Sequence, residues 1–473
     1  MQGYGKYAGV SSLSLTNGGE KISIRDPQGF PIDSVTYSDS WYGSSYKKDG
    51  GWSLERVDTT YSCPNPTNWK PCEHIQGGTP GQQNSVAGTI IDNIPPILLR
   101  AFCNDSASVI LVFNEPIDPN SVANINNYSV NNSLLLTSAG ISGENNQRIR
   151  IKFQYPVLPS TVYTIEVSGI ADCSGNNLLS GSTTRFGIAD SIRKNEIILN
   201  EVLFDPFESG FDFVEIFNKS RKIKDLNELK ISAINQSTNE PEALFFVTEE
   251  PWLIFPDEFL VITENSSVVA SQYYSSYPFH FLQINQLPGM NIDEGHIAII
   301  AGGQRIDEFK YNKSYHFELL NNTKGISLEK INPTFNSMDA SSWHSASTVA
   351  GFATPGFKNS QFSELGIAQK NASVTPEIFT PNNDGKDDFV TFSIVSGSPG
   401  YISNIWIYNV SGQVIFTQNK NNLSGTSEIF TWDGVGDDGT LAPFGIYIAL
   451  LEVFNLKGAI QKYKLPFVVA VKF

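Results

Sequence analysis

The chain reads Ile32-Asp33-Ser34-Val35-Thr36-Tyr37 near its start and Ile306-Asp307-Glu308-Phe309-Lys310-Tyr311 at a position 274 residues later. The same offset relates Ser53-Leu54-Glu55-Arg56 to Ser327-Leu328-Glu329-Lys330, and Trp69 to Trp343. With one residue of slippage, Thr79-Pro80-Gly81 matches Thr354-Pro355-Gly356, and Asn84-Ser85 matches Asn359-Ser360. Because the matches recur in the same order, they indicate an internal duplication.

The two copies differ in what precedes the matched part. The second copy has a long segment that starts near Asn195, and the first copy has only a short one. We therefore expect residue 1 to fall inside a domain and the first copy, residues 1–88, to be incomplete. Such a half domain would expose a sheet edge, so we expect the isolated segment to be poorly folded or to associate with another chain.

The composition predicts an all-β protein. Aromatic residues make up 12% and hydrophobic residues 40% of the 473 residues, with 38 glycines, 25 prolines and only 17% charged residues. This is a strand-rich and turn-rich composition. Apolar residues alternate at two-residue spacing, as Leu13, Leu15, Ile22 and Ile24 do around the hairpin signal Asn17-Gly18. We predict no helix anywhere in the chain.

The length and the punctuation of the sequence predict tandem immunoglobulin-like β-sandwiches, of which the first is incomplete. We place the domains at residues 1–88, 89–190, 191–361 and 370–473, with a linker at 361–370. The strand candidates include Val109–Phe113, Ile149–Phe153, Tyr163–Val167, Ile197–Val202, Phe213–Phe217, Ile405–Tyr408, Val414–Phe416 and Ile446–Val453.

Charge and hydropathy exclude two classes of partner. The net charge is −16 and the isoelectric point is near 4.8, whereas nucleic-acid binding requires clustered Lys and Arg. No run of 18 apolar residues occurs, so we expect no transmembrane helix. The first residues do not resemble a signal peptide, so we expect any export signal to lie outside this sequence.

The four cysteines form two local groups. We expect the pairs Cys63–Cys72 and Cys103–Cys173 to form disulfides, which would imply an oxidising compartment. The alternative is four buried free thiols.

The sequence carries no recognisable catalytic motif. The five histidines are scattered, and we find no HExxH, nucleophile elbow, P-loop or dinucleotide fingerprint. We therefore predict that these residues are not an enzyme.

An Asp-rich loop at residues 382–388 is the one segment with metal-like chemistry. Asn382, Asp384 and Asp388 supply oxygens of the kind that calcium prefers, and Gly385 permits a sharp turn. The alternative, which we favour, is a network of Asx turns that holds the loop through side-chain-to-backbone hydrogen bonds. A second acidic group, Glu201, Asp212 and Glu215, is predicted to be solvated surface charge.

The duplicated segment resembles the bacterial lamin tail domain. In the second copy, residues 199–204 and 213–218 match the start of that family, and the Ser-Leu-Glu motif at 327–329, Trp343 and Thr354-Pro355-Gly356 match its end. The first copy matches only the second half of the family. The resemblance implies an immunoglobulin-like sandwich.

Two further resemblances cover most of the remaining chain. Residues 97–190 resemble bacterial Ig-like domains, through residues 113–118 and 170–176. The last segment is similar to gliding-motility C-terminal modules and flagellar-hook-cap Ig-like modules, through residues 379–388, 407–409, 432–434 and 443–447. In Bacteroidetes-type bacteria such modules often serve as sorting signals, so this resemblance implies contact with export machinery.

These observations favour a non-catalytic, multidomain protein that is secreted or held at the cell surface, where it spaces, anchors or adheres. Its partner would be a protein or a surface polysaccharide. The alternative is the accessory region of a secreted hydrolase, such as a nuclease or phosphatase, whose catalytic domain lies upstream.

Overall fold

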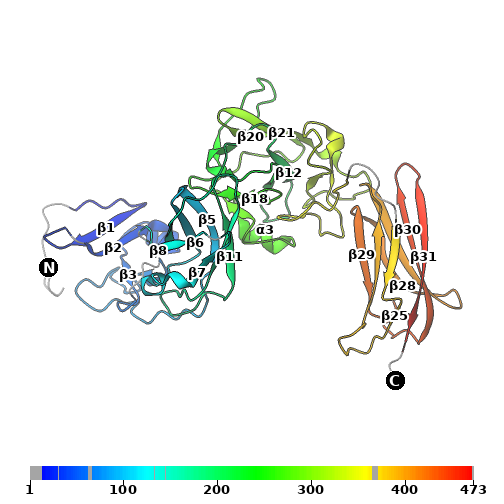
Figure 1. The fold of residues 1–473 in the computed structure, drawn as a ribbon, viewed down its shortest axis with the longest axis horizontal. Helices are drawn as coiled ribbons and strands as arrows, with labels where there is room; N and C mark the ends of the chain where they lie inside the picture. The colour runs from blue at the N-terminus through cyan, green and yellow to red at the C-terminus, as the bar shows by residue number, and fades with distance from the viewer. Residues whose placement is uncertain are drawn as a thin grey trace. The chain divides into compact units, whose positions relative to one another are not determined.

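The computed structural model describes residues 13–29, 31–61, 66–132, 134–143, 145–364 and 371–470. The described chain consists mainly of β-strands and confirms the all-β, tandem Ig-like prediction (Figure 1). It forms two compact units, residues 1–188 and 189–473. Within the described residues, no helix is long and apolar enough to span a bilayer.

The first copy forms two small antiparallel sheets, β1–β2 and β3–β4. The hairpin that we predicted around Asn17-Gly18 is wrong, because these residues form the turn that precedes β1, and the chain reverses at residues 26–29 instead. The elements are β1 (Gly19–Arg25), β2 (Pro31–Ser38), α1 (Ser45–Lys48), β3 (Leu54–Arg56), β4 (Trp69–Pro71) and the 3₁₀ turns Asp39–Tyr42 and Pro66–Asn68.

The next part is a sandwich of a four-stranded sheet, β5-β6-β9-β8, and a three-stranded sheet, β11-β10-β7. All six side chains of β6 are buried, and the core between the sheets includes Val109, Ile149 and Ile165. The elements are β5 (Leu98–Asp105), β6 (Ser108–Phe113), α2 (Pro119–Val122), a 3₁₀ turn (Ile125–Asn127), β7 (Tyr128–Val130), β8 (Leu136–Ile141), β9 (Arg148–Phe153), β10 (Tyr163–Val167) and β11 (Ser182–Phe186).

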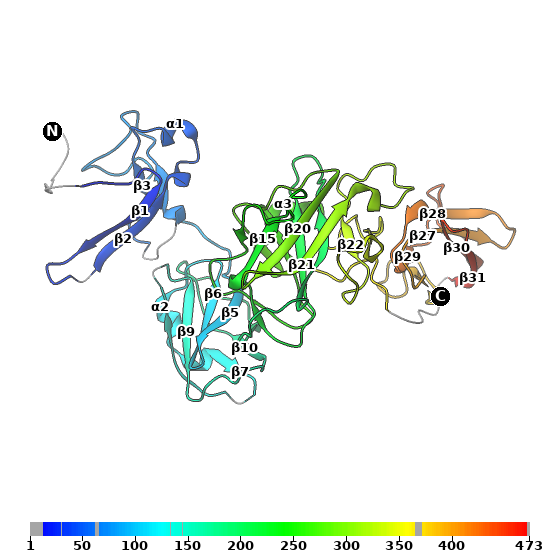
Figure 2. The same cartoon turned by 90° about the horizontal axis from the view of Figure 1, so that it is seen from above.

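The second copy, residues 191–361, is a larger sandwich. A six-stranded sheet, β19-β18-β13-β12-β22-β23, packs on a four-stranded sheet, β16-β15-β20-β21, in which β20 and β21 lie side by side (Figure 2). Every side chain of β12 and β13 is buried. The strands are β12 (Ile197–Leu203), β13 (Phe213–Asn218), β14 (Lys224–Asp225), β15 (Leu229–Ala233), β16 (Phe245–Phe246), β17 (Leu253–Ile254), β18 (Phe259–Thr263), β19 (Phe281–Gln283), β20 (Glu294–Ala301), β21 (Gln304–Asn312), β22 (Leu328–Lys330) and β23 (Trp343–Ser345).

The prediction that the chain has no helix is wrong. The longest described helix is α3 (Ser266–Gln272), and α1 and α2 are single turns. The Asn265 side chain accepts a hydrogen bond from the Val268 N–H at 3.2 Å and so caps the start of α3. The helix is too short for a periodic apolar pattern to reveal it. The second copy also has 3₁₀ turns at Leu226–Glu228, Lys313–Tyr315 and Ala340–Ser342.

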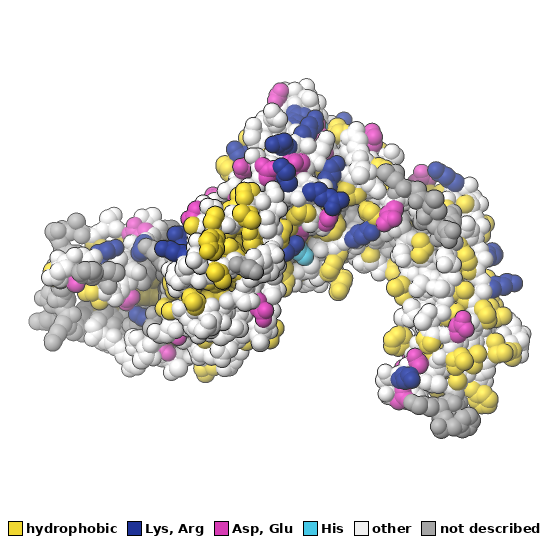
Figure 3. All heavy atoms as spheres, viewed as in Figure 1, with side chains coloured by type: hydrophobic (Ala, Val, Ile, Leu, Met, Phe, Trp, Pro, Cys, Tyr) yellow, Lys and Arg dark blue, Asp and Glu magenta, His cyan; other side chains and the backbone are white. Residues whose placement is uncertain are grey.

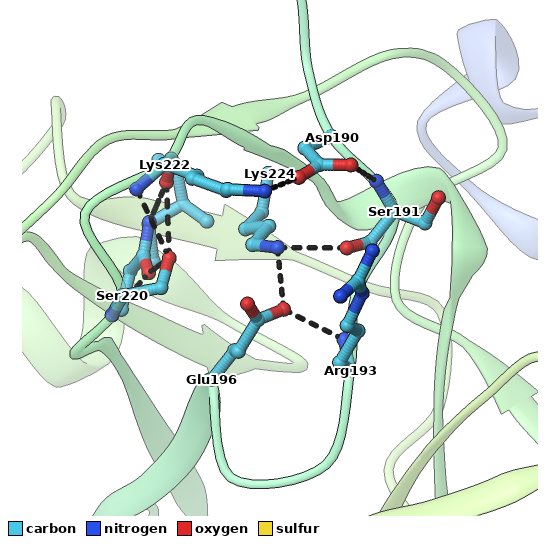
Figure 4. A network of polar contacts seen from close by, with 9 residues as sticks. Asp190, Ser191, Arg193, Glu196, Ser220, Lys222 and Lys224 are labelled. Carbon is cyan, nitrogen blue, oxygen red and sulfur yellow. Dashed lines mark hydrogen bonds and ion pairs between the residues drawn. The ribbon is translucent and has the colours of Figure 1, made fainter. Parts of the chain in front are cut away.

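A polar network fixes the segment that leads into β12 (Figure 4). The fully buried Lys224 donates to the Ser191 carbonyl at 2.7 Å and to Glu196 Oε2 at 2.5 Å. Lys222 pairs with Asp190 beside it. A buried ammonium is tolerated only when its charge and its hydrogens are satisfied, so this network holds residues 190–196 against β14.

The last module is a sandwich of a three-stranded sheet, β24-β26-β29, and a five-stranded sheet, β25-β31-β30-β27-β28. Trp432 lies in the core with Phe379 and Phe467 around it, and its indole N–H donates to the Val435 carbonyl at 2.7 Å. The linker that we predicted at 361–370 falls largely outside the described residues. The strands are β24 (Asn371–Thr375), β25 (Ile378–Phe379), β26 (Val390–Val395), β27 (Tyr401–Asn409), β28 (Val414–Leu423), β29 (Ser427–Trp432), β30 (Gly445–Asn455) and β31 (Ile460–Val469).

Candidate functional site

The duplication read from the sequence is reproduced in the backbone pairing. In the second copy β22 pairs with β23, so that Lys330 lies opposite Trp343. In the first copy β3 pairs with β4, and the equivalent residues Arg56 and Trp69 lie opposite each other. The two copies therefore share the same strand register.

The matched Ser-Leu-Glu motif supplies the glutamate that holds the closing turn. In the second copy Glu329 Oε1 accepts from the Thr354 hydroxyl at 2.8 Å, and its Oε2 accepts from the Ser360 hydroxyl at 2.8 Å. In the first copy Glu55 accepts from the Thr79 hydroxyl at 2.5 Å and from the Ser85 hydroxyl at 2.7 Å. The Thr-Pro-Gly repeat is thus a turn tied to a strand by one carboxylate.

Two further contacts are duplicated. Asn359 donates to the Lys330 carbonyl at 2.9 Å, as Asn84 does to the Arg56 carbonyl at 2.8 Å. The basic residue after each glutamate faces an equivalent aspartate, since Lys330 lies 4.0 Å from Asp307 and Arg56 lies 3.2 Å from Asp33.

In the second copy the closing turn is also bound to glutamates of the opening strands. Glu201 of β12 accepts from the Thr354 N–H at 2.9 Å, and Glu215 of β13 accepts from the Gly356 N–H at 2.6 Å. Both side chains are fully buried. Our prediction that Glu201 and Glu215 are solvated surface charge is therefore wrong, because the central strands of this sheet are covered on both faces. Asp212, immediately before β13, is partly buried.

Burial of three neighbouring carboxyls raises their pKa values. Burial, followed by the charge of Glu329, raises the pKa of Glu201 to about 8. Burial also raises the pKa of Glu215 well above its ordinary value and raises the pKa of Glu329. The cause is that burial disfavours the charged form, and at Glu201 and Glu215 a neighbouring carboxylate adds to this effect.

The geometry around Thr354 supports a shared proton. Its hydroxyl lies 2.8 Å from Glu329 Oε1 and 3.1 Å from Glu201 Oε2. A hydroxyl has one hydrogen to donate, and a protonated Glu201 carboxyl, which its raised pKa favours, would donate in the second contact. The arrangement is a structural clasp, because it ties the closing turn to β12, β13 and β22.

A separate acidic cluster lies in the Ig-like part. Asp92, Glu115 and Asp172 each offer a carboxylate oxygen within 4.8 Å of the other two. Among the described residues, this is the cluster whose spacing could hold a metal ion. Burial, followed by Asp92 and Asp172, raises the pKa of Glu115 to about 7. Sequence reasoning missed this cluster, because its members are far apart in the chain.

The Asp-rich loop is built of Asx turns in the structure. Asp388 accepts from the Gly385 N–H at 2.7 Å and from the Asp384 N–H at 3.2 Å, and Asp384 accepts from the Lys386 N–H at 2.9 Å. Asn382 accepts from the Asp384 N–H at 3.2 Å. The three residues therefore lie together, and calcium binding by them stays a prediction.

The predicted disulfide pairs are wrong, because Cys72 and Cys103 carry free thiols. Cys72 occupies the place of Ala346 in the second copy, a fully buried small-residue position, and a thiol fits there as a small apolar group. Burial, followed by Asp105, raises the pKa of Cys103 to about 12. Cys63 lies outside the described residues.

Two family models match parts of the chain. Residues 373–467 match the CHU_C type IX secretion signal domain, and residues 89–187 match a bacterial Ig-like domain, Big_5. No curated protein matches the chain.

Similar solved structures include the N-terminal part of the bacterial S-layer protein SbsC, with 16% identity, a TM-score of 0.19, and coverage of 37% of this chain and 42% of that one. Dimeric latent PorU from Porphyromonas gingivalis has 10% identity and a TM-score of 0.17 over 95% of this chain and 40% of that one. A DUF4876 family protein from Bacteroides thetaiotaomicron has 14% identity and a TM-score of 0.17, with coverage of 42% of this chain and 76% of that one. The chain thus spans less than two thirds of the first two structures.

The family matches define the class of protein. The chain is a secreted or cell-surface protein of the Bacteroidetes type, built from Ig-like domains and carrying a type IX secretion signal domain. This confirms the predicted location.

Proposed function

We propose that the chain is a non-catalytic spacer or anchor of the cell surface, delivered there by its C-terminal module. The observation that carries this proposal is the match of residues 373–467 to a type IX secretion signal domain. The rest of the described chain consists of two further β-sandwiches and the two small sheets of the first copy. A spacer requires only such folded modules in series.

The outer face of the five-stranded sheet supports a recognition role for this module. Ile448 lies opposite Tyr408 on one neighbouring strand and opposite Pro466 on the other, and its side chain is 41% exposed. Ile446 and Val414, 57% and 47% exposed, extend this apolar row. Hydrophobic side chains are visible on the surface of the module in Figure 3. Exposed apolar patches of this kind mark interaction sites.

This proposal includes the duplicated segment as a lamin tail domain that serves as the spacing element. The support is the set of contacts that the Ser-Leu-Glu and Thr-Pro-Gly motifs make in both copies. Adhesion to a protein or surface polysaccharide belongs to the same proposal.

Export of the full chain tests the proposal. We would express it behind a secretory signal peptide in a bacterium with a type IX system and follow its arrival on intact cells with an antibody. We expect surface or medium localisation for the full chain, and periplasmic retention for a chain that lacks residues 371–473. Retention should also follow in a strain without the secretion system.

A matched pair of variants tests the apolar face. We expect Ile448→Lys to reduce export several-fold, and Ile429→Lys, at a 61% exposed position on the other sheet, to leave it unchanged. Both positions are exposed, so neither variant should unfold the module. Export that does not depend on residues 371–473 would overturn the sorting role, and equal effects of the two lysines would overturn the role of this face.

A further inference from the structure

The first copy has an uncovered face where the second copy has a buried one. Ile306 is 1% exposed, and its equivalent Ile32 is 67% exposed. Pro355 and Gly356 of the closing turn are buried, and the equivalent Pro80 and Gly81 are exposed. The sequence is matched at these positions, so the difference comes from what packs on them.

In the second copy β12 covers this face and bonds to it on two sides. It pairs with β22, so that Glu201 lies opposite Glu329. On the other side, Asn195 precedes β12 and its N–H donates to the Ile306 carbonyl at 3.1 Å. The Leu199 N–H of β12 donates to Asp307 at 2.9 Å. Among the described residues of the first copy, β3 pairs with β4 alone and β2 with β1 alone.

The closing turn provides chemical evidence for an occupant of this face. In the second copy the N–H groups of Thr354 and Gly356 donate to Glu201 and Glu215. In the first copy, the equivalent N–H groups of Thr79 and Gly81 donate to no acceptor among the described residues. The turn therefore has two unused donors at the positions that bind carboxylates in the second copy.

We propose that the first copy is a docking site for a β-hairpin with the chemistry of β12–β13. Its first strand would carry an Asn-Glu pair between apolar residues, and its second strand a glutamate. The free edge of β3 fits an extended strand, the two turn donors fit carboxylates, and Ile32 fits an apolar side chain. Another molecule of this chain cannot lend its own β12–β13 easily, because every side chain of those strands is buried in its own sandwich.

A labelled synthetic peptide of residues 195–219 tests the proposal on the full chain. We expect saturable binding by fluorescence anisotropy and slower hydrogen exchange at residues 54–56 and 79–81, with no change at residues 328–330. A peptide with Glu201→Lys and Glu215→Lys is the matched control, and we expect its affinity to fall at least tenfold.

Two variants of the chain sharpen the test. Ile32→Lys places a charge on the proposed contact face and should remove binding, whereas Leu179→Lys, at a 77% exposed position of the Ig-like part, should not. Because both positions are exposed, both variants should remain folded. A hairpin fused to the N-terminus of the full chain through a flexible Gly-Ser linker provides a second measurement, in which exchange at residues 54–56 should slow even if the free peptide associates poorly.

Three results would overturn the proposal. One is unchanged exchange at residues 54–56 in both the peptide and the fusion experiments. Another is equal binding of the control peptide. The third is concentration-dependent dimerisation of the chain alone that Ile32→Lys abolishes, since the occupant would then be a second copy. The proposal rests on the internal duplication, so a failure of export would leave it intact.

Discussion

The two copies contain the same closing turn, but only one of them is buried. In both, a glutamate after Ser-Leu holds a Thr-Pro-Gly turn through two hydroxyl groups at nearly equal distances. Yet Leu328 and Trp343 are buried, and the equivalent Leu54 and Trp69 are half-buried. The comparison shows that the turn and its strand pair form from local sequence, whereas the core of the sandwich depends on the opening strands.

The same glutamate has opposite pKa shifts in the two copies. Burial raises the pKa of Glu55, but hydrogen bonds from Thr79, Ser85 and Cys72 outweigh it and bring the pKa down to about 2. Burial prevails at Glu329, whose pKa is raised, and Glu201 lies directly opposite it. The opening strands thus convert an ionised carboxylate into part of a proton-sharing cluster.

The largest expected difference between the copies concerns the matched isoleucines. Ile306→Lys should destabilise the second copy by about 4 kcal/mol or more, because it buries an unpaired charge. Ile32→Lys should change stability by about 0.5 kcal/mol or less, since the side chain is exposed. Hydrogen exchange of β20–β21 and of β1–β2 measures the two effects separately. Similar losses at both sites would contradict the difference in burial.

The matched glutamates should show a smaller difference. Glu329→Ala leaves the Ser360 hydroxyl and the Gln361 N–H without their acceptor in a buried site and leaves the Thr354 hydroxyl with Glu201 alone, so we expect a loss of about 3 kcal/mol. Glu55→Ala should cost about 1 kcal/mol, because water reaches its partners. Urea unfolding followed by exchange at β22 and β3 gives both values. A larger loss at Glu55 would show that the first copy is already covered in solution.

The last expected difference between the copies is the pH dependence of their stability. A pKa that is raised in the folded state stabilises the fold at low pH, and this stabilisation is lost as pH rises through the folded value. With the pKa of Glu201 raised from 4.5 to about 8 in the folded protein, the melting temperature of the second copy should fall as pH rises from about 4.5 to about 8.

Glu201→Gln should flatten that pH profile, because the amide cannot ionise. The first copy should show no dependence in this window, since the lowered pKa of Glu55 removes stability only under strong acid. An unchanged profile in the Glu201→Gln variant would mean that Glu201 is already ionised in the folded protein.

The sequence predicted those features that short motifs encode. Strand Tyr163–Val167 was predicted to the residue, and the offset matches identified the duplicated turn, because alternation and turn residues are local signals. Prediction from the sequence failed where the burial of a residue depends on pairing between distant segments. Glu201 and Glu215 have charged side chains, which are usually exposed. They are buried because β12 and β13 lie in the middle of a covered sheet.

The same distinction explains the other corrections and the missed cluster. Cys63 and Cys72 are close in sequence, but Cys72 fills a buried small-residue position and carries a free thiol. Asp92, Glu115 and Asp172 come from three separate segments, so no spacing rule could have grouped them. The Asx turns of residues 382–388 were favoured from sequence, because their donors and acceptors are neighbours in the chain.

Because β31 lies between β25 and β30, the folding of this module depends on completed translation. The ribosome makes β31 after every other strand of its module, and Phe467 and Val469 complete the core. A nascent chain that stops before Ile460 leaves β30 and β25 without their shared partner. If this module directs export, only polypeptides translated through Val469 can present it folded, so premature termination products are withheld from the cell surface.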